Sequence, residues 1–80
     1  MKIPRDINCE KLVKLLKKLE YIETRQRGSH LRLTRKYSDG EHHITIPNHD
    51  PIKIGTLNSI LNDISSHIGI TKQQLIEKLF

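Results

Sequence analysis

The sequence of 80 residues predicts an α+β fold: a helix, a three-stranded antiparallel sheet, a second helix and a short C-terminal helix. Two patterns support this prediction. Leucine and isoleucine recur with helical spacing in a segment before the centre of the chain and in another after it. Between them, apolar and polar residues alternate on both sides of two glycine-containing turns, a pattern typical of hairpins. With no internal repeat or low-complexity segment, we expect residues 1–80 to form a single domain.

The first predicted helix begins after Asn8, because asparagine is favoured at the N-cap. Ile7, just before this cap, can pack against Leu12 one turn later. The helix then separates leucines from lysines on opposite faces: Leu12, Leu15, Leu16 and Leu19 against Lys11, Lys14, Lys17 and Lys18. We therefore expect an amphipathic helix with a buried apolar face and a basic exposed face.

A hairpin is predicted next, from strands over residues 21–26 and 31–37 joined by the two-residue loop Arg27-Gly28. In that register Arg25 faces His30, and Ile22 faces Leu33. The register gathers the apolar residues of both strands on one face, which a half-buried hairpin requires. It places His30 on the opposite, solvent-exposed face.

A second hairpin is predicted around Ser38-Asp39-Gly40-Glu41, because Asp-Gly suits the positive φ of a tight turn. The predicted register pairs Tyr37 with His42 and Leu33 with Ile46. Ile44 and Ile46 then join the apolar face of the first hairpin. Proline cannot donate to a strand ladder, so the third strand should end at Pro47.

The second helix is predicted to begin near Gly55-Thr56, and the last helix at a capping box formed by Thr71 and Gln74. Residues on the apolar faces of these elements should form the core: Leu12, Leu15, Leu16, Leu19, Ile22, Leu31, Leu33, Ile44, Ile46, Leu57, Ile60, Leu61 and Ile64.

Composition favours an anionic partner. Fourteen Lys and Arg against nine Asp and Glu give a net charge of +5, which suits nucleic acid or an acidic protein. The single cysteine excludes an intrachain disulfide. No apolar run is long enough to cross a membrane, and no early apolar run indicates a secretory signal. We expect a cytoplasmic protein.

The five histidines do not predict a metal site or any other cofactor. His42, His43 and His49 lack the regular spacing and the cysteine or carboxylate company of a structural zinc site. Adjacent His42 and His43 also point to opposite faces of a strand.

His30 has the neighbours that phosphodiester cleavage requires. An imidazole can accept and donate protons near neutral pH, and guanidinium groups such as those of Arg25 and Arg32 can hold a phosphate. Extending the second hairpin past Pro47 would bring His49 roughly opposite His30, as a second acid–base group. Ser29 is adjacent, but no carboxylate is placed to complete a Ser–His–acid set.

Several motifs in this order resemble the HicA toxins (YcfA-like family): Gly28-Ser29-His30, the Ser-Asp-Gly turn, the segment 44–49 and the segment 54–61. The resemblance spans nearly the whole chain. It implies a fold like that of double-stranded-RNA-binding domains and a toxin that cleaves mRNA, with the family's catalytic histidine at His30. Many members have a second histidine directly after it, where this chain has Leu31.

The resemblance also implies an acidic HicB-like antitoxin as a partner, beside the mRNA substrate. We expect the RNA to contact residues around His30, namely Arg25, Arg27, Gly28, Ser29, Arg32, Lys36 and His49. The alternative is a non-catalytic RNA-binding module of the same fold. Such modules carry a lysine cluster at the start of the second helix, where this chain has only Lys53.

Overall fold

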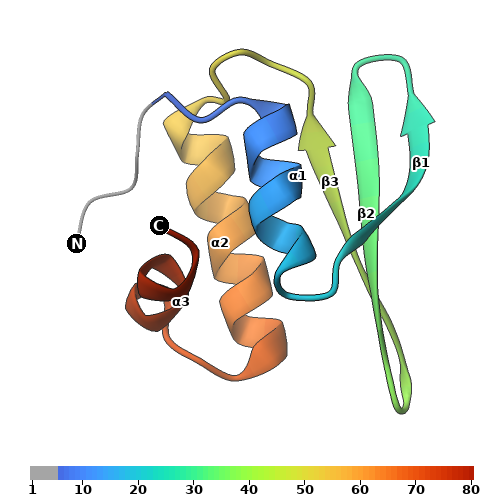
Figure 1. Ribbon diagram of the computed structural model, residues 1–80, viewed down its shortest axis with the longest axis vertical. Coiled ribbons are helices and arrows are strands. Elements are labelled where there is room, and N and C mark those ends of the chain that lie inside the picture. Colours follow the sequence, from blue (N-terminus) through green and yellow to red (C-terminus); the bar gives the residue numbers. More distant parts are fainter. Residues whose placement is uncertain (1–5) are drawn as a thin grey trace.

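The computed structural model describes residues 6–80 and has the predicted α+β architecture. The elements are α1 (Cys9–Lys17), β1 (Ile22–Arg27), β2 (His30–Tyr37), β3 (Gly40–Pro47), α2 (Ile54–Ile68) and α3 (Lys72–Leu79). The strands form one antiparallel sheet in the order β1-β2-β3. Figure 1 shows α1 and α2 side by side next to the sheet, with α3 beside α2. One face of the sheet is therefore covered by helices, and we call the other its outer face.

Helix α1 begins at the predicted cap, since the side-chain oxygen of Asn8 accepts a hydrogen bond from the backbone N–H of Lys11 at 2.8 Å. It ends in a tight turn in which Glu20 adopts a left-handed conformation, with φ of 70°. That turn directs Tyr21 into the core, where its side chain is fully buried. The aromatic residue that leads into the first strand is thus a core residue that the predicted list omits.

The loop of the first hairpin differs from the prediction. Arg27 faces His30, so the two-residue loop is Gly28-Ser29 rather than Arg27-Gly28. Gly28 takes the positive φ of this turn (54°), a conformation that glycine adopts without steric cost. Arg25 consequently faces Arg32, and the predicted pairing of Arg25 with His30 is wrong.

A β-bulge corrects the predicted core face of β1. The register shifts between Glu23 and Arg25, so Thr24 is an extra residue without a partner on β2. One extra residue reverses the faces of all residues beyond it. Ile22 therefore faces Thr34 on the outer face and is 52% exposed, although the alternation pattern predicts it in the core.

The second hairpin has the predicted core face but a different register. Tyr37 faces Gly40, Leu33 faces Ile44 and Leu31 faces Ile46, a displacement of two residues from the predicted pairs. Because side chains alternate with a period of two, this displacement leaves every residue on its predicted face. The predicted pairing of Tyr37 with His42 is wrong, whereas the burial of Ile44 and Ile46 is confirmed.

Helix α2 begins at Ile54, close to the predicted start, and ends at Gly69 in a left-handed conformation. Helix α3 has the predicted capping box, in which Thr71 and Gln74 exchange side-chain-to-backbone hydrogen bonds of 2.9 and 3.0 Å. No helix among residues 6–80 is long and apolar enough to span a membrane.

Ten of the thirteen predicted core residues are buried, Leu15 and Leu19 are partly buried, and Ile22 is exposed. The core also contains residues of α1, α3 and the connecting segments that the prediction omits: Ile7, Cys9, Val13, Tyr21, Ile52, Leu75, Ile76 and Leu79. The helices hold the sheet from one side only, which leaves its outer face free to carry a functional site.

Candidate functional site

The outer face of the sheet carries most of the predicted site residues. His30 is exposed at the start of β2, with Arg27 as its partner on β1 and Pro47 on β3. Arg32 follows two residues later on the same face and faces Arg25. The guanidinium-bearing residues and the imidazole thus share one surface, although Arg27 rather than Arg25 is the cross-strand neighbour of His30.

Arg25 and Arg32 also border a shallow depression of about 200 Å³ on the outer face. Its wall includes Thr34, whose hydroxyl is 2.8 Å from the hydroxyl of Thr24 and 2.8 Å from Nδ1 of His43. These bonds satisfy Thr34, which is buried even though it lies on the outer face. They also attach the bulged residue to β2, so the bulge is part of what positions the arginines.

The sequence interpretation missed His43 as a neighbour of the arginines. Its partner on β2 is Thr34, two residues beyond Arg32, and its side chain lines the same depression. The alternation of β3 alone already indicates that His43 lies opposite the core face. Only the corrected register shows which residues of β2 it adjoins.

The loop before His30 is held by β3. The N–H of Asn48 donates to the carbonyl of Ser29 at 2.6 Å, so pairing continues one residue past Pro47. His49 lies beyond this contact, in an exposed loop, with its own N–H bonded to the carbonyl of Pro47 at 2.9 Å. Pro47, and not His49, faces His30, so the predicted pairing of the two histidines is wrong.

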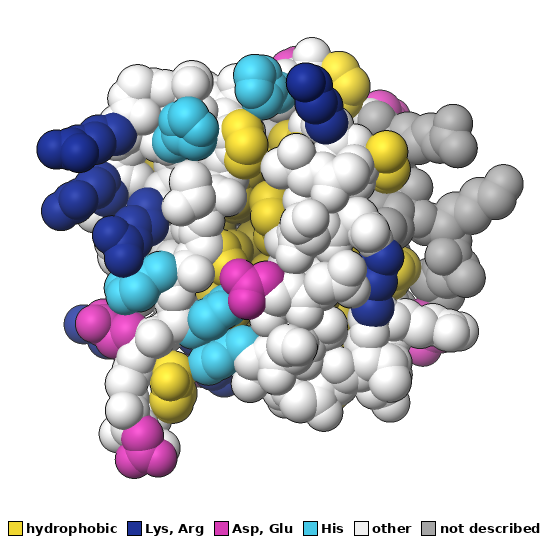
Figure 2. Space-filling model, turned by 180° about the vertical axis from the view of Figure 1, so that it is seen from behind, with side chains coloured by type: hydrophobic (Ala, Val, Ile, Leu, Met, Phe, Trp, Pro, Cys, Tyr) yellow, Lys and Arg dark blue, Asp and Glu magenta, His cyan; other side chains and the backbone are white. Residues whose placement is uncertain are grey.

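The remaining predicted site residues are spread along the hairpins. Gly28 and Ser29 form the exposed loop next to His30, whereas Lys36 pairs with Glu41 near the far end of β2. Figure 2 shows the molecule from behind, with a group of lysine and arginine side chains beside histidine side chains on one flank. The structure therefore concentrates positive charge near one end of the sheet and leaves Lys36 apart from it.

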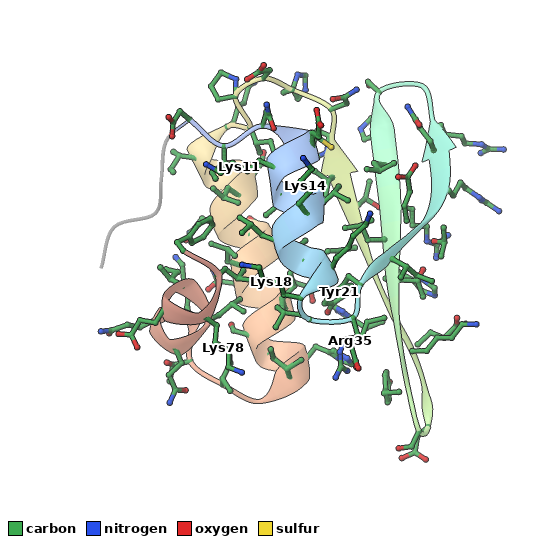
Figure 3. All side chains as sticks on the ribbon, viewed as in Figure 1. Lys11, Lys14, Lys18, Tyr21, Arg35 and Lys78 are labelled. Carbon is green, nitrogen blue, oxygen red and sulfur yellow. The ribbon has the colours of Figure 1, made fainter. Side chains whose placement is uncertain are left out.

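A second cluster of titratable groups lies on the helix-covered side, where the hairpin meets α2. The ring of His42 stacks on that of His67 with centroids 4.1 Å apart, and its Nε2 is 3.2 Å from a carboxylate oxygen of Asp63. Since the N–H at Nε2 donates a hydrogen bond to this carboxylate, Nδ1 of His42 carries no hydrogen and accepts a hydrogen bond of 2.7 Å from the hydroxyl of Tyr21. Figure 3 shows Tyr21 at the foot of α1 and Arg35 below it.

The pKa shifts of Tyr21 and His67 both favour the uncharged form of the side chain. Burial, opposed by Arg35 and reinforced by Asp63, raises the pKa of Tyr21 to about 12, so its hydroxyl stays protonated and donates. Burial lowers the pKa of His67, and the nearby His42 and Arg35 lower it further against the opposing effect of Asp63. Arg35 also donates to Nε2 of His67 at 3.4 Å, which favours neutral imidazole. We infer that these contacts stabilise the packing of the second hairpin against α2.

Residues 6–80 provide neither an assembled set of metal ligands nor an exposed thiol. No group of three or more His, Cys, Asp or Glu side chains in this part of the chain is arranged to hold a metal ion. Cys9 is buried, and burial followed by the charge of Glu23 raises the pKa of its thiol, which disfavours the reactive thiolate. A titratable feature of the outer face next to the arginines is the exposed imidazole of His30.

Comparisons with known proteins agree with the motif resemblance. The family described as "HicA toxin of bacterial toxin-antitoxin" matches residues 9–65, a span that runs from the start of α1 into the last turns of α2 and includes the whole sheet. The searches of curated proteins and of solved structures found no match. Because the matched span covers well over half of the sequence, the chain belongs to the HicA toxin family of bacterial toxin–antitoxin systems.

Proposed function

We propose that this protein is the toxin of a type II toxin–antitoxin system and an endoribonuclease that cleaves mRNA in the cytoplasm, with His30 as general acid–base catalyst. One observation carries the proposal: in a chain of the HicA toxin family, an exposed histidine lies among arginines on the uncovered face of the sheet. Arg27 faces His30 directly, and Arg32 follows it on the same face.

The proposed chemistry uses only protein side chains. As the attacking hydroxyl oxygen bonds to phosphorus and the bond from phosphorus to the leaving ribose oxygen breaks, His30 removes the proton from the attacking oxygen or donates one to the leaving oxygen. Arg27 and Arg32 hold the phosphate and stabilise the negative charge that develops on its oxygens, since guanidinium groups bind phosphate in a bidentate manner. These two roles account for cleavage without a metal ion. Gly28 and Ser29 would admit the RNA backbone next to His30, and Arg25, Lys36 and His49 would contact it farther along.

The decisive variant is His30→Gln, which keeps a polar side chain but cannot exchange a proton near neutral pH. A positioned general acid or base contributes about 10²–10⁴-fold to rate, so cleavage of RNA by purified protein should fall by that factor, and growth arrest on expression should disappear. Because His30 is exposed, the free energy of unfolding should change little.

The matched control is His43→Gln, which removes a second exposed histidine of the same face. It should retain most of the cleavage rate at an equal folded fraction. Equal cleavage by wild type and His30→Gln would retire the catalytic role. The fold and basic face would then support a non-catalytic RNA-binding module.

The same surface should also bind an acidic antitoxin of the HicB type. A free ribonuclease in the cytoplasm must be restrained, and the positive charges of Arg25, Arg32 and Lys36 suit a partner with exposed carboxylates. This proposal explains the net charge of +5 through two anionic partners, RNA and antitoxin, that compete for one face.

A further inference from the structure

A cleft of about 400 Å³ lies between α1 and the inner face of β1, and His30 is one of its lining residues. Its volume lies within the range of small-ligand sites. Figure 3 shows Lys14, another lining residue, extending from α1. His30 thus adjoins two surfaces, the outer face with its arginines and this cleft.

The bulge places Glu23 of β1 on the helix-covered side, where it lines this cleft. Gln26 faces Leu31 and Glu23 faces Leu33, so β1 directs polar side chains toward the helix-covered side, where an apolar strand would pack against α1. Cys9, Val13 and Leu31 supply apolar surface to the cleft, and Glu23, Gln26 and Asn48 supply hydrogen-bonding groups. Most of the lining residues are polar or charged, which suits a ligand that carries both hydrogen-bonding groups and a phosphate.

The charges facing the cleft are mixed. Lys14 and Lys17 come from α1, together with Glu10, whose carboxylate is 3.8 Å from the ammonium group of Lys14. Glu23 comes from β1, and within residues 6–80 no lysine or arginine nitrogen lies within 4 Å of its carboxylate. A ligand that offers hydrogen-bond donors to Glu23 and a phosphate to Lys17 would complement both walls.

We propose that the cleft is a nucleotide subsite: the base next to the scissile phosphate enters it, and guanine is preferred. Guanine presents two adjacent donors, N1–H and the N2 amino group, to which one carboxylate can bind in a bidentate manner. Single-stranded RNA is recognised in this way, through bases turned out from the strand. Gln26 and Asn48 would bind the remaining polar edge, and Lys17 would bind the flanking phosphate. The proposal rests on RNA cleavage at His30, because that role places the scissile phosphate at the mouth of the cleft.

The test uses ¹H–¹⁵N spectra of the His30→Gln protein titrated with each of the four nucleoside 5′-monophosphates. The side-chain amide groups of Gln26 and Asn48 report from the cleft, and those of Asn62 and Gln73, on exposed faces of α2 and α3, serve as internal controls. Guanosine monophosphate should change the chemical shifts of the Gln26 and Asn48 side-chain amides and leave those of Asn62 and Gln73 unchanged. A good bidentate contact discriminates between bases by about 1–3 kcal/mol. Glu23→Gln should therefore weaken the binding of guanosine monophosphate at least about fivefold and leave the binding of uridine monophosphate nearly unchanged.

Shifts confined to the outer face, or no shift at all, would overturn the subsite. In the cleavage assay, Glu23→Gln with His30 intact should change which positions of an RNA are cut while total cleavage persists. An unchanged cleavage pattern would also contradict the subsite. Equal cleavage by wild type and His30→Gln would instead contradict the role of His30, so the two proposals fail in different measurements.

Discussion

At the scale of single residues, the two arginines that face each other across β1 and β2 are proposed to bind phosphate, a role distinct from the one proposed for His30. Arg25 and Arg32 pair directly, and no carboxylate within residues 6–80 forms an ion pair with either. Two neighbouring guanidinium groups repel each other until an anion lies between them. This geometry favours phosphate binding over a contribution to folding stability.

Arg25→Ala and Arg32→Ala should therefore weaken RNA binding more than His30→Gln does. Each lost phosphate contact reduces the slope of log affinity against log salt concentration by about 0.7 for single strands. Fluorescence anisotropy of a labelled RNA at several salt concentrations measures both quantities. An unchanged salt slope in both arginine variants would place the RNA backbone elsewhere on the protein.

His67 gives the fold a predictable pH dependence. Its pKa is lowered in the folded protein by burial first, and then by His42 and Arg35, with Asp63 opposing; the ring of Tyr37 also packs on it, with centroids 4.9 Å apart. A histidine with a lowered folded pKa binds more protons when unfolded, so stability rises with pH through its titration range. His67 thus contributes fully above its unfolded pKa of about 6.5, and this contribution is lost as pH falls below it.

Urea unfolding at pH 7.5 and at pH 5.5 checks this expectation. Wild type should be less stable at the lower pH, and His67→Gln should show a smaller difference between the two. His49→Gln, in the exposed loop outside the cluster, should keep the wild-type difference. If His67→Gln left that difference unchanged, the pH dependence would arise from other groups.

At the scale of elements, the sequence predicts the helices and the core face of β2 and β3 correctly, whereas the strand pairing and the core face of β1 are wrong and part of the core is missed. The caps at Asn8 and Thr71 are local, so side chains within three residues determine them. The second register differs by two residues, which conserves the faces and hence the predicted core. No local sequence pattern predicts the bulge at Thr24, because this extra residue of β1 is held by a hydrogen bond to Thr34 on the next strand.

The same limit explains what could be predicted of the site. His30 and its basic surroundings follow from the sequence, because an exposed face needs only the alternation of β2. Which arginine faces His30 depends on the position of the two-residue loop, which lies one residue later than predicted, and the presence of Glu23 in the α1–β1 cleft depends on the bulge. Neither is encoded in the spacing of apolar residues.

Two substitutions on adjacent strands test the bulge directly. Leu33 is fully buried and Ile22 is 52% exposed, although simple alternation assigns both to the core. Leu33→Ala should cost about 2–5 kcal/mol of unfolding free energy, and Ile22→Ala less than about 1 kcal/mol. Chemical denaturation at constant m-value measures both. Comparable losses in the two variants would mean that β1 pairs without the bulge and that Ile22 packs in the core.

At the scale of the whole molecule, the apolar core and the exposed arginines lie on opposite sides of the sheet. The helices, the apolar core and the Tyr21–His42–His67 cluster all lie on the covered side of the sheet. The outer face carries His30 and the arginines and contributes little to burial. An antitoxin of the proposed kind that binds this face would therefore cover His30 and the arginines without disturbing the core.

This arrangement predicts inhibition by occlusion, a test that rests on the proposed function. A HicB-like antitoxin should protect the backbone amides of residues 25–32 from hydrogen exchange and prevent binding of labelled RNA. Arg25→Glu should slow association with the antitoxin, because charge complementarity acts mainly on the association rate. Lys72→Glu, an equal charge change at the start of α3, is the matched control and should associate at nearly the wild-type rate. A complex that leaves residues 25–32 unprotected and still binds RNA would mean that the antitoxin acts at another surface.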